Sequence, residues 1–177
     1  MRKVLFILGQ LTDADADWLS ENGKRVRVPK GAELIKHGTQ IDTVYIILEG
    51  AMAVMTARGI RLAQVASGDI LGEMSMVDSS PTSASVVVEQ DSLVLAVSKQ
   101  QLMEKLKQDI GFAARFYRAL ALFLADRMRN TISRMGYGDS DAADVPGAGD
   151  GELDEGVLDN VHLAGARFER MLKKLAG

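Results

Sequence analysis

Two neighbouring stretches of this sequence combine glycine, a carboxylate and short hydroxyl side chains, a set of residue types suited to binding a small anion. The first stretch reads Gly68-Asp69-Ile70-Leu71-Gly72-Glu73-Met74-Ser75, and the second, after a short gap, reads Pro81-Thr82-Ser83-Ala84-Ser85-Val86. A glycine such as Gly72 lets the backbone come close to a ligand, and the start of a following helix offers N–H groups without partners. Residues of these types can form a concave turn with backbone donors suited to a small anion.

The two stretches resemble the phosphate-binding cassette of the cyclic-nucleotide-binding domain family, which reads approximately Gly-Glu-x-(Ser/Ala), a short helix, and then Pro-Arg-(Ser/Thr)-Ala. The family includes bacterial catabolite activators, cyclic-nucleotide-gated channels and kinase regulatory subunits. Residues upstream follow its pattern of strands and turns: Gly31, Glu33, Ile35, Gly38, Asp42, Tyr45, Ile46, Ile47 and Gly50. The resemblance covers residues ~12–135, and an ordered set of this kind is specific where a single glycine would not be.

This resemblance implies a ligand and a role for individual residues. Glu73 would accept a hydrogen bond from a ribose 2′-hydroxyl, and Ser83 and the Ala84 amide would contact phosphate oxygens. The implied ligand is a cyclic nucleotide, cAMP or cGMP, or a related nucleotide, and no cofactor is expected. The cassette residues predicted to contact it are Leu71, Gly72, Glu73, Met74, Ser75, Thr82, Ser83 and Ala84. Contacts to a lid or base are predicted for Arg127, Asn130 and Thr131.

One residue departs from the family pattern at the position that normally carries the phosphate-binding arginine. Thr82 follows the proline here, and Ser83, Ala84 and Ser85 bring no cation either. A bidentate guanidinium–phosphate contact is typically worth ~2–5 kcal/mol, so its loss weakens a micromolar site severely. Three explanations stay open: another cation (Arg58, Arg61 or Arg127) replaces it, the ligand is not a standard cyclic mononucleotide, or the pocket is vestigial.

Several of these residues also have plainer explanations. Glu73 could only cap a turn, and the hydroxyls of Thr82, Ser83 and Ser85 could satisfy nearby backbone groups. For Asn130 and Thr131, placement on the protein surface is the simpler expectation.

The elements that must position the cassette are short strands separated by glycine turns. Apolar, largely β-branched segments recur between residues 26 and 97, and the glycines between them are Gly31, Gly38, Gly50, Gly59, Gly68 and Gly72. Arg58-Gly59 is typical of a hairpin tip. About eight such strands predict an α+β fold built on an antiparallel, jelly-roll-like β-roll, because closure removes exposed strand edges. Thr12 is a good N-cap for a short helix before the roll, which Gly23 should end.

After Ser98 the pattern becomes helical, with a first helix around Leu102 and Leu106 and a long helix over residues 109–135 that Asp109 caps. The long helix has two apolar stripes. One is Phe112, Phe116, Ala119 and Phe123, and the other is Ala113, Tyr117, Leu120, Leu124, Met128, Ile132 and Met135. Either both stripes lie deep against the roll, or one packs on the same helix of a second subunit. We expect a homodimer through residues 109–135.

The C-terminal part of the chain differs in composition from the rest. Residues 139–160 hold eight acidic residues and no Lys or Arg. Residues 136–156 are therefore predicted to form a flexible linker. An amphipathic helix follows, and it could pack on its own domain or, through residues 157–175, on an unknown partner protein. The expected division is 1–137 for the nucleotide-binding-like domain and 138–177 for the linker and helix.

Composition excludes several other classes of function. The 177 residues include no cysteine, which removes disulfides and thiolate metal sites and favours a cytoplasmic location. The histidines, His37 and His162, are far apart, so no metal site is expected. Residues 1–138 carry 17 basic and 15 acidic residues, without the basic excess of a nucleic-acid binder, and no apolar run is long enough to span a membrane.

The function predicted from these observations is a non-enzymatic regulatory module that senses a ligand, with cyclic-nucleotide binding weakened or altered by Thr82. It drives an interaction rather than binding DNA directly, since no helix-turn-helix follows residue 135. The alternative is a ligand-free scaffold that dimerises and docks a partner protein.

Overall fold

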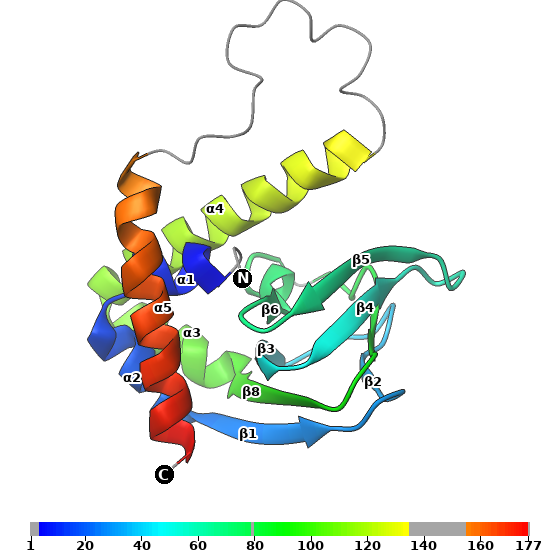
Figure 1. Cartoon of the computed structure of the whole chain (residues 1–177), viewed down its shortest axis with the longest axis horizontal. Coiled ribbons are helices and arrows are strands. Elements are labelled where there is room, and N and C mark those ends of the chain that lie inside the picture. The colour runs from blue at the N-terminus through cyan, green and yellow to red at the C-terminus, as the bar shows by residue number, and fades with distance from the viewer. Residues whose placement is uncertain (1–3, 79, 135–154, 177) are drawn as a thin grey trace, which may run out of the picture.

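The computed structural model describes residues 4–78, 80–134 and 155–176 and is shown in Figure 1. Its helices are α1 (Val4–Gln10), α2 (Asp13–Asn22), α3 (Lys99–Gln108), α4 (Ile110–Arg134) and α5 (Glu155–Ala176), with a short 3-10 helix η1 (Glu73–Met76). Its strands are β1 (Gly23–Val28), β2 (Glu33–Ile35), β3 (Thr43–Glu49), β4 (Ala51–Met55), β5 (Arg61–Ala66), β6 (Ile70–Leu71), β7 (Ser85–Val88) and β8 (Ser92–Ser98).

The strands form two four-stranded antiparallel sheets, in the orders β1-β8-β3-β6 and β2-β7-β4-β5. Alternate residues of facing strands, such as Ile47, Met52 and Val88, fill the space between the sheets. The predicted antiparallel β-roll of about eight strands is therefore confirmed. Chain order explains the local pairing, since β4 and β5 are joined by the turn at Arg58-Gly59 that the sequence indicated.

The N-terminal region contains one helix more than the sequence predicted. Thr12 caps α2 as expected, and its hydroxyl and the Asp15 carboxylate form a reciprocal capping box. The additional helix, α1, is short and has no such cap signal. Ile7 and Leu8 of α1 are buried, and the helix packs on α4 and α5, so tertiary contacts rather than local sequence stabilise it.

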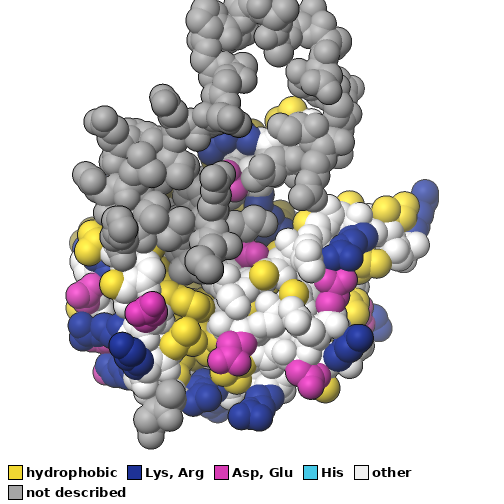
Figure 2. Space-filling model, viewed as in Figure 1, with side chains coloured by type: hydrophobic (Ala, Val, Ile, Leu, Met, Phe, Trp, Pro, Cys, Tyr) yellow, Lys and Arg dark blue, Asp and Glu magenta, His cyan; other side chains and the backbone are white. Residues whose placement is uncertain are grey.

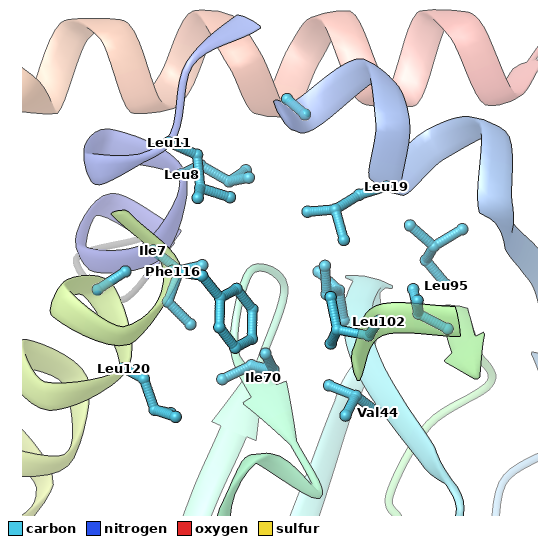
Figure 3. Packing of buried hydrophobic residues seen from close by; sticks show 14 of the residues in the cluster. Ile7, Leu8, Leu11, Leu19, Val44, Ile70, Leu95, Leu102, Phe116 and Leu120 are labelled. Carbon is cyan, nitrogen blue, oxygen red and sulfur yellow. The ribbon is translucent and has the colours of Figure 1, made fainter. Parts of the chain in front are cut away.

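The long helix α4 begins where Asp109 predicted, because the Asp109 carboxylate accepts a hydrogen bond from the Phe112 N–H at 2.8 Å. Phe112, Phe116 and the rest of their stripe are buried against the roll and the N-terminal helices. Figure 3 shows Phe116 pointing from α4 toward Ile70. The second stripe divides: Leu120 is buried, while exposed members are Tyr117 at 43%, Met128 at 62% and Ile132 at 46%. Met135 lies outside the described residues.

The C-terminal helix α5 is longer than predicted and packs beside α1 and α2 (Figure 1). Ala164 and Met171 are buried in the same hydrophobic cluster as α1, α2 and α4. Its basic side chains face acids of α2 in five ion pairs among the described residues, the shortest of which are Arg167–Asp13 at 2.7 Å, Arg170–Asp17 at 2.6 Å and Lys174–Glu21 at 2.6 Å. Of the two placements left open, the helix adopts the one on its own domain. The predicted linker falls largely outside the described residues, and docking of residues 157–175 on a partner stays a prediction.

Charged side chains of both signs are interspersed on the face shown in Figure 2, where the described residues form no single broad basic patch. None of the described helices has the length and hydrophobicity needed to cross a membrane.

Candidate functional site

A cavity opens between the second sheet, the η1 turn and α4. Its apolar wall comes from inward-facing residues of the roll, and its polar wall comes from the cassette and from one residue of α4. The lining residues are Ile35, Ile41, Val54, Leu71, Gly72, Glu73, Met74, Ser75, Asp78, Ser80, Pro81, Thr82, Ser83, Ala84, Val86 and Arg127. Two parts of the chain that are far apart in sequence thus meet at one site.

Gly72 shapes the turn that brings the cassette backbone to this cavity. Its φ is +79°, in the left-handed region that side chains other than glycine rarely adopt. A Cβ atom at this position would lie 2.8 Å from the Ile41 Cδ1 and 2.9 Å from the Thr43 carbonyl oxygen. Glycine is therefore required twice, by backbone conformation and by close approach. The helix that follows is the four-residue 3-10 turn η1.

Glu73 follows Gly72, and its side chain is only 3% exposed. Its Oε1 accepts a hydrogen bond from the Arg127 Nη1 at 2.6 Å, so the two side chains form an ion pair across the cavity. Burial raises the pKa of Glu73, Arg127 lowers it, Asp69 raises it further, and the net direction is upward. The carboxylate is thus held both by a backbone group of the turn and by a guanidinium from α4, and its contact with a ligand stays a prediction.

The hydroxyl groups of the cassette are bound to backbone groups. The Thr82 hydroxyl accepts a hydrogen bond from the Thr39 N–H at 3.1 Å and donates to the Lys36 carbonyl oxygen. The Ser75 hydroxyl donates to the Gly72 carbonyl oxygen at 2.6 Å, and the Ser85 hydroxyl accepts from the His37 N–H at 3.0 Å. The hydroxyls of Thr82 and Ser85 thus tie the second cassette stretch to the loop before β3, and a ligand contact by Thr82 stays a prediction.

The structure brings all eight predicted cassette residues to one cavity, together with Arg127. The side chains of Asn130 and Thr131 lie outside the described residues. Two of the three cations considered as substitutes do not line the cavity: Arg61 pairs with Glu89 at 2.9 Å on the β-roll, and Arg58 lies at the tip of the β4–β5 hairpin.

Sequence reasoning missed the apolar lining residues that lie outside the cassette. Ile35, Val54 and Val86 lie on three different strands, and only the sheet order brings them to the same wall. Their alternation along each strand indicated an inward face, but the sequence held no signal for which inward residues would border a cavity rather than fill the core.

Comparison with known proteins agrees with this geometry. Residues 25–109 match the family model described as "Cyclic nucleotide-binding domain". The chain is 25% identical over 118 residues to an uncharacterised NTE family protein of Mycobacterium tuberculosis, covering 67% of this chain and 20% of that protein. It is 30% identical over 113 residues to a Pycsar effector protein of Xanthomonas perforans, covering 63% of this chain and 37% of that protein.

A crystal structure of a cyclic nucleotide-binding domain from Methylobacillus flagellatus superposes with a TM-score of 0.69 at 24% identity, covering 78% of this chain and 83% of that one. This likeness confirms the fold. The chain spans about a fifth of the length of the first curated relatives that it matches.

Proposed function

We propose that the chain, whose residues 25–109 match the cyclic nucleotide-binding domain model, is a regulatory ligand-sensing module whose cavity takes a cyclic nucleotide or a related nucleotide. The observation that carries this proposal is the ion pair of Glu73 and Arg127 at the wall of a cavity lined by the cassette. A buried carboxylate can accept a hydrogen bond from a sugar hydroxyl, and the guanidinium beside it can donate hydrogen bonds to an anionic group. The apolar wall suits a base.

We propose also that the module acts by binding rather than by catalysis. The hydroxyls of Ser75 and Thr82 donate to backbone carbonyl oxygens, so neither is directed at a general base as a nucleophile would be. The Glu73 carboxylate is engaged by a guanidinium. These contacts support a site that holds a ligand.

The test is a thermal-melting panel of cAMP, cGMP and the corresponding nucleosides on the full chain. A ligand at 100 times its dissociation constant adds about 2.7 kcal/mol of stability, which raises the melting temperature of a chain of this size by roughly 5–10 °C. Glu73→Gln should reduce the shift, because the amide is a weaker acceptor for a hydroxyl. Glu89→Gln, which alters an exposed pair with Arg61, should leave it unchanged. No shift at millimolar nucleotide would reject the sensor function.

A second candidate function, a dimerising scaffold, is supported by the exposed apolar side chains of α4. Tyr117, Met128 and Ile132 recur on one side of the helix without cover from the described residues of their own chain. A homodimer through α4 would bury them. In sedimentation, Met128→Glu should give monomers, whereas Val26→Glu, an exposed residue on β1, should not. A wild-type protein that is monomeric at high concentration would contradict the dimer.

A further inference from the structure

The positive charge at the cavity comes from a residue of α4 rather than from the cassette. Glu73 is almost completely buried, while the Arg127 side chain is 32% exposed and lines the cavity. The guanidinium therefore reaches from a buried carboxylate to the open space where a ligand would lie. It also lies 5.6 Å from the ring of Phe123, one turn earlier on α4, which restricts where it can move.

An anionic ligand in this cavity needs a cation, because a buried unpaired charge is strongly unfavourable. The cassette provides none at Thr82, Ser83 or Ala84. Among the described residues that line the cavity, Arg127 is the one Lys or Arg. A guanidinium has five N–H donors in a planar fork, so it can hold a carboxylate oxygen and a second anion together.

We infer that Arg127 supplies the phosphate-binding charge that the cassette lacks, bridging Glu73 on one side and the phosphate of the ligand on the other. This inference rests on the proposed function, since it requires that the cavity take a nucleotide. It makes Arg127 the residue that distinguishes a cyclic nucleotide from an uncharged nucleoside. It also means that the anionic group of the ligand is held by α4, the helix whose outer face is exposed.

The test compares two variants on the same helix. Arg127→Gln removes the guanidinium from the cavity, and Arg129→Gln removes one from an exposed position that does not line it. Affinity for a 3′,5′-cyclic nucleotide and for the nucleoside with the same base is measured by calorimetry on the full chain. Arg127→Gln should weaken the cyclic nucleotide about 30-fold, the lower end of the range for hydrogen-bonded charge pairs because Arg127 is partly exposed. Nucleoside affinity should change little, and Arg129→Gln should alter neither.

A second variant separates loss of charge from loss of shape. Adding Thr82→Arg to Arg127→Gln returns a guanidinium to the cassette position, and it should restore the preference for the cyclic nucleotide over the nucleoside. If Arg127→Gln weakens nucleotide and nucleoside equally, or if the double variant melts cooperatively without regaining the preference, the inference is overturned.

The failure of this inference is distinguishable from failure of the proposed function. A wild-type protein that binds the cyclic nucleotide, with Arg127→Gln binding it equally well, overturns the role of Arg127 and leaves the sensor function intact. A wild-type protein that binds neither nucleotide nor nucleoside overturns both.

Discussion

The close approach at Gly72 gives a prediction whose size follows from the geometry. Gly72→Ala places a methyl group 2.8 Å from the Ile41 Cδ1 and 2.9 Å from the Thr43 carbonyl oxygen, at a φ of +79°. Gly59 is a matched control, since its φ is +76° and nothing lies within 4 Å of the added Cβ. The two substitutions share the backbone strain and differ in the collision.

The strain of a left-handed conformation at alanine is about 1–2 kcal/mol, which is the whole expected loss for Gly59→Ala. At Gly72 the methyl group must also displace Ile41 and a backbone oxygen of β3, and overpacking of this kind costs about 1–3 kcal/mol. We therefore expect Gly72→Ala to lower the free energy of unfolding by about 2–5 kcal/mol. Ile41 lines the cavity, so its displacement should also weaken any nucleotide bound there.

Urea denaturation followed by circular dichroism measures both losses, and the slope of the transition shows whether two-state unfolding is retained. Equal destabilisation of Gly72→Ala and Gly59→Ala would refute the reasoning, because it would mean that Ile41 and Thr43 do not approach this turn. If Gly72→Ala is destabilised but binds nucleotide with unaltered affinity, the conformation of this turn does not determine nucleotide binding.

The remaining predictions concern two buried carboxylates and the last helix. Asp15→Asn should cost about 3 kcal/mol at pH 7, since it breaks the buried pair with Arg115. Although burial opposes it, hydrogen bonds from Arg115 and Thr12 hold the pKa of Asp15 below its ordinary 3.8, so denaturant titrations should show this loss vanish as pH falls below that value. Burial raises the pKa of Glu73 above its ordinary 4.5, so wild-type stability relative to Glu73→Gln should fall as pH rises above 4.5 in the same assay. Met171→Ala should lower the unfolding free energy by about 2–4 kcal/mol, and Leu163→Ala, half-exposed on the same helix, by less than about 0.5 kcal/mol.

Much of the roll could be predicted from the sequence because its signals are local. Apolar, largely β-branched segments predicted the strands, and the turn glycines named with them all have positive φ: Gly31, Gly38, Gly50, Gly59, Gly68 and Gly72. Thr12 and Asp109 gave two helix starts, because an N-cap acts on N–H groups within three residues of it.

The features that could not be predicted depend on contacts between distant segments. Helix α1 is a seven-residue segment whose stability comes from α4 and α5. Glu73 and Arg127 are separated by 54 positions, and no periodicity relates them. The sequence indicated Arg127 as one of three candidate cations and as a lid or base contact, but not its pairing with Glu73, and the structure places Arg127 at the cavity.

Helix α4 connects the cavity to the N-terminal helices. One end of the helix carries Arg127 at the cavity, and the other packs Phe112 and Phe116 among the N-terminal helices. Helix α1 lies between α4 and α5, and Arg167 of α5 donates to the carbonyl oxygens that end α1. Packed interiors change between discrete arrangements rather than deforming smoothly. A ligand that shifted α4 at Arg127 would therefore also change the packing of Phe112 and Phe116, and the contacts of α1 and α5 would re-form around the new position of α4.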